Sequence, residues 1–149
     1  MEELAATFKL ERKLSLNSLN LSNNQKCKPF AIATLMCSLA NNSAVPINRL
    51  VLNNNDMEVS RKNSVAAYIA LTKAIISMLN CSKYLTHLSL ANCGIGKEVM
   101  LAIGEGLFKN SKLQMLNMRG NRVKMNGIKE FVRSCFQNTK LALRHVDFS

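Results

Sequence analysis

The stretch LTHLSLANC, residues 85–93, decides how this chain folds, because its pattern returns several times along the sequence. It reads Leu-x-x-Leu-x-Leu-x-x-Cys, and the other copies end in Asn or carry Ile or Met at single leucine positions. A self-similar pattern of this kind is the signature of a repeat protein. The other copies are LNSLNLSNN at 16–24, INRLVLNNN at 47–55 and LQMLNMRGN at 113–121, with a partial copy, LRHVDFS, at 143–149.

Each copy predicts a short strand followed by a turn. Apolar residues alternate with polar ones, so one face of the strand is buried and the intervening side chains face outward. The Asn or Cys that ends the copy is expected to turn the chain and to bond backbone groups that the turn leaves unpaired. We therefore predict strands near residues 16–21, 47–52, 85–90, 113–118 and 143–148.

The segments between the copies have the period of a helix. Val99, Ile103 and Leu107 follow the third copy four residues apart, and a similar set follows the fourth copy. Such spacing places apolar side chains on one helix face, which closes the unit against its strand. The same periodicity extends to Asn110 and Asn138, which we interpret as members of these faces.

The second unit is longer than the others. Its start and the start of the third unit are 38 residues apart, whereas Leu85 and Leu113 are 28 residues apart. The extra residues fall near 58–64, and a helix is predicted over 65–79 with Ser64 as its N-cap.

A repeat of about 28 residues with a full helix, and with Asn and Cys exchanging at the turn, resembles the ribonuclease-inhibitor class of leucine-rich repeats. The resemblance covers residues 14–149. It implies an α/β leucine-rich-repeat solenoid of four to five repeats, a horseshoe arc with parallel strands on the concave face and helices on the convex face. Relatives of this class, such as ribonuclease inhibitor, tropomodulin-like actin regulators and ciliary scaffolds, hold protein partners.

Both ends depart from the repeat pattern. Residues 1–13 predict a lone helix, or partial cap, ahead of the repeats at 14–149. The sequence stops inside the last strand pattern, so the C-terminal cap is expected to be missing. Because a solenoid needs polar terminal caps, we expect further repeats or a partner to cover the final strand.

Composition favours a cytoplasmic protein, with cytoskeletal and ciliary locations among the options. The five cysteines are odd in number and form no CxxC pair, which indicates free thiols in a reducing compartment. No apolar run approaches the roughly 20 residues that cross a bilayer, and the N-terminus has no signal-peptide pattern. We expect no membrane association.

The sequence offers no catalytic constellation, so we expect no enzyme, cofactor or metal. His87 and His145 share one strand position two repeats apart, and strands about 4.8 Å apart place them roughly 10 Å from each other. That separation is too large for one metal ion. Cys93 is expected to be a buried structural residue, and Cys37 and Cys135 are expected to lie in the core.

The outward strand positions form the predicted contact surface. The chain has 20 Lys and Arg against 9 Asp and Glu, a net charge of +11, and a basic rim follows the fourth strand. Aligned strands place Asn20, Val51, Ser89, Asn117 and Asp147 in one outward column. The alternative is a solvated sheet face that binds nothing tightly. The candidate partner-binding residues are Arg49, His87, Met115, Asn117, Arg119, Arg122, Lys124, Arg144 and His145.

These observations favour a non-catalytic scaffold that binds an acidic protein through its concave face and C-terminal basic rim. Ribonuclease inhibition is disfavoured, because a basic enzyme requires an acidic concave face. Actin, tubulin and nucleic acid are acidic and remain open. One alternative is a nucleic-acid-binding basic module, against which stands the lack of interleaved aromatic residues for stacking. Another is a fragment of a larger repeat protein without independent activity.

Overall fold

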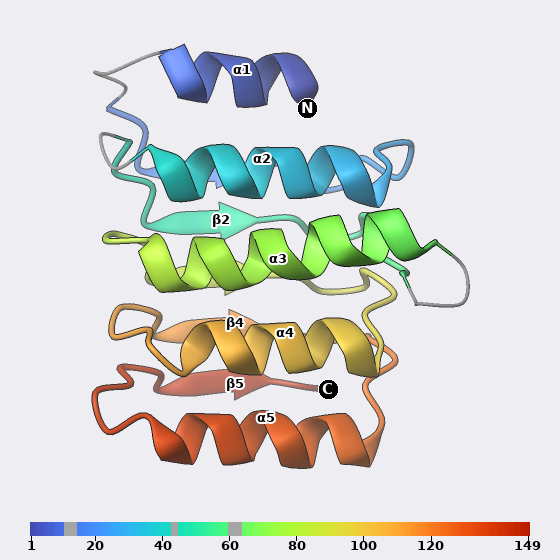
Figure 1. The fold of residues 1–149 in the computed structure, drawn as a ribbon, viewed down its shortest axis with the longest axis vertical. Coiled ribbons are helices and arrows are strands. Elements are labelled where there is room, and N and C mark those ends of the chain that lie inside the picture. Colours follow the sequence, from blue (N-terminus) through green and yellow to red (C-terminus); the bar gives the residue numbers. More distant parts are fainter. Residues whose placement is uncertain (11–14, 43–44, 60–63) are drawn as a thin grey trace.

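The computed structural model describes residues 1–10, 15–42, 45–59 and 64–149, in which five helices alternate with five strands (Figure 1). The helices are α1 (Glu2–Leu10), α2 (Pro29–Asn41), α3 (Val65–Cys81), α4 (Lys97–Leu107) and α5 (Met125–Gln137). The strands are β1 (Ser18–Asn20), β2 (Arg49–Val51), β3 (His87–Ser89), β4 (Met115–Asn117) and β5 (His145–Asp147).

The strands form one parallel sheet in the order β1-β2-β3-β4-β5. Leu50 pairs with Leu88, and Leu88 with Leu116, so the predicted register of the repeats is confirmed. The helices form a second layer over one face of the sheet (Figure 1). The chain is therefore a leucine-rich-repeat solenoid with parallel strands on its concave face and helices on its convex face.

The core lies between the two layers and is almost entirely aliphatic. Leu50, Leu88 and Leu116 point into it from neighbouring strands and are almost completely buried. Helices α2, α3, α4 and α5 pack side by side in chain order, and their apolar faces close the core from the other side. Burial of these stacked side chains is the main favourable term in the stability of such an array.

The asparagines that end the second and fourth repeat patterns, Asn55 and Asn121, bond backbone groups at the turns, as the sequence predicts, and they also join neighbouring turns. The Asn121 side-chain oxygen accepts hydrogen bonds from the backbone N–H groups of Cys93 and Ile95, at 3.0 Å each. Its amide donates to the carbonyls of Leu90, at 2.7 Å, and Met118, at 2.8 Å. One side chain thus satisfies backbone groups of two repeats.

A second row of asparagines precedes the first. Asn23, Asn54 and Asn92 adopt left-handed backbone angles, with φ of 64°, 56° and 53°. The Asn54 amide donates to the Asn23 side-chain oxygen at 2.8 Å, and Asn92 donates to Asn54 at 3.1 Å. The fourth repeat has Gly120 at this position, with φ 66°, and the Asn92 oxygen occupies the space that a Cβ there would need.

The assignment of Asn110 and Asn138 to apolar helix faces was wrong. Both lie in the loops that follow helices, where their side chains bond the backbone. Asn110 donates to the Leu79 carbonyl, and Asn138 donates to the carbonyls of Leu107, at 2.8 Å, and Asn110, at 2.7 Å. The spacing of inward-facing residues continues past the ends of α4 and α5. Asn110 and Asn138 occupy these next inward-facing positions, where polar side chains bond the backbone.

Helix α3 extends two residues beyond its predicted end, to Cys81. Ser64 occupies the N-cap position in an extended conformation, but its side chain makes no capping hydrogen bond. The predicted insertion near 58–64 lies partly outside the described residues, which exclude 60–63. The boundary between the predicted N-terminal helix at 1–13 and the repeats at 14–149 also falls outside them, so this division and the missing C-terminal cap stay predictions.

Within the described part of the chain, every helix is too short or too polar to cross a bilayer.

Candidate functional site

An open hollow of about 240 Å³ lies over the concave side of strands β2 to β5. Each strand contributes its first and third residues, which the register places in two rows across the sheet. Five of the nine predicted contact residues meet here. The lining side chains of the two rows are Arg49, His87, Met115 and His145 in the first, and Val51, Ser89, Asn117 and Asp147 in the second.

Hydrogen bonds orient His87 within the first row. The Thr86 hydroxyl donates to the Asn48 carbonyl at 3.1 Å, and its oxygen lies 2.8 Å from Nδ1 of His87. The contact with Thr86 therefore holds the imidazole ring through Nδ1.

Asp147, which strand alternation places in the outward column, contributes a carboxylate to the lining of the hollow. Hydrogen bonds from the backbone N–H of Ser149, at 2.9 Å, and from the Ser149 side chain lower the pKa of Asp147. The positive charges of Arg119 and His145 act in the same direction. Asp147 therefore stays ionised and offsets part of the positive charge at the β5 end of the hollow.

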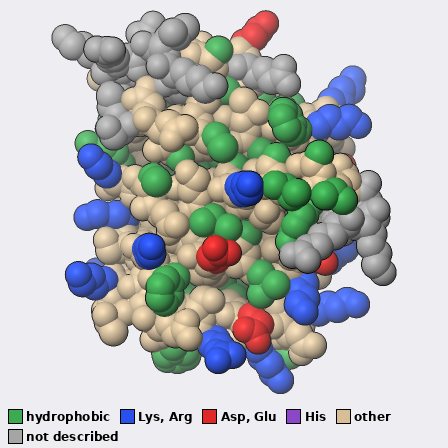
Figure 2. Space-filling model, in the orientation of Figure 1, with side chains coloured by type: hydrophobic (Ala, Val, Ile, Leu, Met, Phe, Trp, Pro, Cys, Tyr) green, Lys and Arg blue, Asp and Glu red, His purple; other side chains and the backbone are tan. Residues whose placement is uncertain are grey.

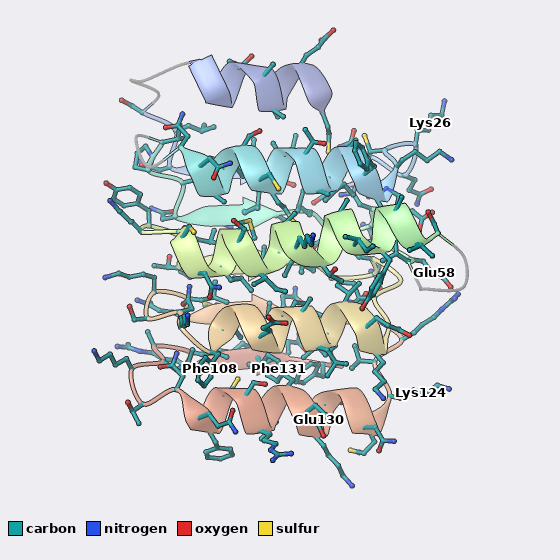
Figure 3. All side chains as sticks on the ribbon, in the orientation of Figure 1. Lys26, Glu58, Phe108, Lys124, Glu130 and Phe131 are labelled. Carbon is teal, nitrogen blue, oxygen red and sulfur yellow. The ribbon has the colours of Figure 1, made fainter. Side chains whose placement is uncertain are left out.

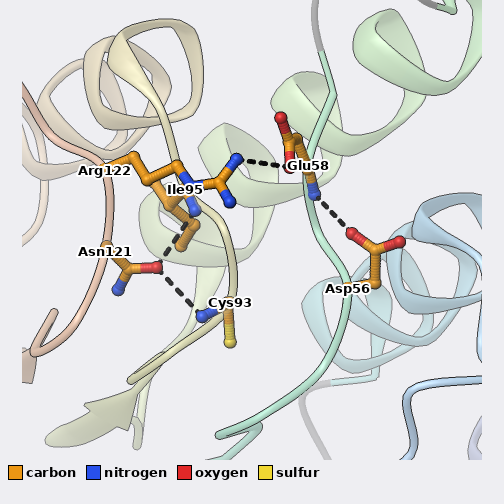
Figure 4. Close-up of polar contacts among 6 residues, drawn as sticks. All are labelled: Asp56, Glu58, Cys93, Ile95, Asn121 and Arg122. Atoms are coloured by element: carbon orange, nitrogen blue, oxygen red, sulfur yellow. Dashed lines mark hydrogen bonds and ion pairs between the residues drawn. The ribbon is translucent and has the colours of Figure 1, made fainter.

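The predicted basic rim is also less basic than its sequence indicates. Arg122 forms an ion pair with Glu58, whose carboxylate oxygen lies 3.1 Å from the guanidinium nitrogen (Figure 4). Glu58 follows β2, so the pair spans the turn after β3, where Gly94 leaves room for the Glu58 side chain. The two residues are 64 positions apart in sequence, and no local pattern predicts that they meet.

The remaining predicted residues lie outside the hollow. Lys124 is the N-cap residue of α5 and lies on the same edge of the molecule as Glu58 (Figure 3). Arg119 follows β4 and influences the pKa of Asp147. Arg144 precedes β5 and lines a separate hollow beneath α5. The nine residues are thus divided among three surfaces.

Val51, Ser89 and Asp147 line the hollow but were not among the predicted contact residues. All three belong to the outward column that strand alternation predicts, and that column was the signal for them.

The cysteines differ in burial and environment. Cys93 is buried, as predicted, and its thiol donates to the Leu52 carbonyl at 3.1 Å. Burial raises the pKa of Cys93, and it raises the pKa of Cys135 to about 11. Cys37 and Cys135 are only partly buried, so their assignment to the core was incomplete. Among the described residues, no group of three or more His, Cys, Asp or Glu side chains could hold a metal ion.

No protein-family model matches the chain, and no curated protein matches it. Solved structures do match. The tropomodulin C-terminal domain of Caenorhabditis elegans has a TM-score of 0.74 at 14% sequence identity, covering 99% of this chain and 81% of that one. The leiomodin-1 actin-binding site 2 has a TM-score of 0.74 at 18% identity, covering 99% and 78%. Over nearly its whole length, the chain shares the leucine-rich-repeat-like fold of these two domains.

Proposed function

We propose that this chain is a non-catalytic protein-interaction module of the cytoskeleton, which binds an acidic surface of a protein partner through its concave face. The observation that carries the proposal is the row Arg49, His87, Met115 and His145, which comes from four adjacent strands and opens into one hollow. A row fixed by a sheet is preorganised, so little conformational entropy is lost when a partner binds.

Charge indicates the chemistry of the partner. The net charge of +11 attracts acidic surfaces and speeds encounter with them. Arg49 and the two histidines supply cationic or hydrogen-bonding groups, and Met115 supplies an adaptable apolar contact between them. Lys124 and Arg119 extend this surface along the rim, whereas Arg122 is engaged by Glu58.

Actin is the first partner to test, because one structural neighbour is an actin-binding site of leiomodin-1. Neither neighbour supports the ciliary alternative. We also propose that the repeats are of the ribonuclease-inhibitor class, because the third and fourth repeats are 28 residues apart and a full helix lies between β3 and β4.

Co-sedimentation with filamentous actin tests the proposal. Arg49→Glu in the hollow and Lys73→Glu on the exposed surface of α3 make the same charge change on opposite faces. We expect the first variant to weaken binding at least tenfold, about 1.4 kcal/mol, and the second to have little effect. Binding should also weaken with added salt.

Equal losses in the two variants would show that net charge alone drives association, and would contradict a concave site. Failure of the wild-type chain to bind actin would remove actin as the partner. Tight RNA binding at physiological salt, with a steep salt dependence, would favour the nucleic-acid alternative.

A further inference from the structure

The outer side of the last repeat exposes side chains whose counterparts are buried in the preceding repeat. Leu113, Leu116 and Met118 of the β4 repeat are almost completely buried. The corresponding residues of the β5 repeat are only partly buried, although they belong to the same pattern: Leu143, Val146 and Phe148. Comparison with the β4 repeat therefore identifies an apolar surface that the described residues leave partly uncovered.

Helix α5 contributes an exposed apolar stripe to this surface. Met125 is 65% exposed, Val132 is 39% exposed and Phe136 is 85% exposed. Their spacing of seven and then four residues places them on one side of the helix. The neighbouring residue Phe131 is buried, and its ring packs edge-on against Phe148 of the β5 repeat, with 5.8 Å between the ring centroids.

A hollow of about 430 Å³ lies between this stripe and β5. It is lined mainly by apolar side chains of α5, the following loop and β5: Phe131, Val132, Cys135, Phe136, Leu141, Leu143 and Val146. In each inner repeat, the corresponding space is filled by the helix of the next repeat, as α5 lies beside α4 (Figure 1). The shape that fits is an amphipathic helix laid along α5.

The charges around this surface determine which helix it accepts. Exposed Lys129 and Arg133 of α5, Lys140 of the next loop and Arg144 before β5 are accompanied by Glu130. Figure 2 shows Lys and Arg side chains at the lower edge of the molecule, over α5. A second copy of the chain would bring the same cations together, which costs free energy.

From these observations we propose that the surface formed by α5 and β5 docks an amphipathic helix of another polypeptide, with acidic residues flanking its apolar stripe. Leucine-sized side chains of that helix would fill the hollow beside Phe136, and its carboxylates would face Lys129 and Arg144. This surface is separate from the concave hollow, so the proposal does not depend on the concave face binding actin.

Fluorescence anisotropy of a labelled, staple-stabilised helical peptide tests the proposal. The first probe carries Leu at i, i+3, i+4 and i+7 with Glu at the flanking positions, and the second replaces each Glu by Lys. We expect the full chain to bind the acidic probe at least tenfold more tightly than the basic one.

Two variants that each place Asp at an equally exposed apolar position localise the binding. Val132 and Leu101 are each 39% exposed, on α5 and α4 respectively. Val132→Asp should weaken binding of the acidic probe at least tenfold, whereas Leu101→Asp should leave it unchanged. Phe136→Ala provides a second test, because a side chain that is 85% exposed contributes little to folding.

Equal binding of the two probes, or unchanged binding after Phe136→Ala, would overturn the proposal. A dimer in light scattering that Phe136→Asp dissociates would show that a second copy is the occupant. Loss of binding in Arg49→Glu would place the peptide in the concave hollow, and would contradict the proposal without affecting the concave site.

Discussion

At the scale of single residues, amide side chains connect the turns of neighbouring repeats. Asn55 is buried in the turn after β2. Its oxygen accepts from the Asn24 backbone at 3.1 Å, and its amide donates to the carbonyls of Leu21, at 2.9 Å, and Leu52, at 2.7 Å. Cys93 takes this position in the next repeat and bonds the same Leu52 carbonyl through its thiol. The position requires a short polar side chain that can donate inward.

Replacing Asn55 should therefore be costly. Asn55→Ala leaves backbone groups of two turns unpaired in a buried place, and we expect the free energy of unfolding to fall by about 2–4 kcal/mol. Urea denaturation measures this change. The control is Asn80→Ala on the exposed surface of α3, which should stay within about 0.5 kcal/mol of the wild type. Similar losses in both variants would contradict the role assigned to Asn55.

At the scale of elements, α4 is held between α3 and α5 by close backbone approach. A Cβ added at Gly106 would lie 2.8 Å from the Leu79 Cβ on α3. A Cβ added at Gly104 would lie 3.2 Å from the Ser134 hydroxyl oxygen on α5. The first neighbour is a buried carbon near the backbone, whereas the second is the end of a side chain that can rotate. The two faces of α4 therefore tolerate added volume differently.

These glycines provide a matched pair of substitutions. Gly106→Ala should lower the free energy of unfolding by about 1–3 kcal/mol, because the crowded helices must separate. Gly104→Ala should be near neutral, since Ser134 can move and alanine favours a helix by about 1 kcal/mol over glycine. Thermal melts followed by circular dichroism measure both. Stabilisation by Gly106→Ala would show that α3 and α4 are packed less tightly than described.

At the scale of the whole molecule, each repeat contacts only its neighbours, so stability depends on position in the array. Leu19 and Leu50 occupy the same site on paired strands β1 and β2. Leu50 is fully buried between two strands, whereas Leu19 is partly exposed at the end of the sheet. A leucine side chain therefore removes more apolar surface from water on β2 than on β1.

The same substitution at Leu19 and Leu50 measures how much the contribution of a leucine to stability depends on its position in the array. Leu50→Ala should lower the free energy of unfolding by about 2–5 kcal/mol, as expected for a buried leucine that leaves a cavity. Leu19→Ala should cost clearly less, because solvent already reaches that site and less of a cavity forms. Urea titrations of both variants compare the costs. Equal values would indicate that β1 is covered as completely as β2.

The sequence by itself determined the repeat, the register of Leu50, Leu88 and Leu116 and the contents of the outward rows, because strand alternation is local and recurs in every unit. Val51 and Asp147 belong to those rows, and the tertiary structure places both in the lining of the concave hollow. Asn110 and Asn138 follow the period of the repeat, but only the tertiary structure showed that their amides bond the carbonyls of Leu79 and Leu107 in the preceding helices. Only the tertiary structure paired Arg122 with Glu58, because that contact depends on loop lengths and side-chain rotamers that leave no periodic trace in the sequence.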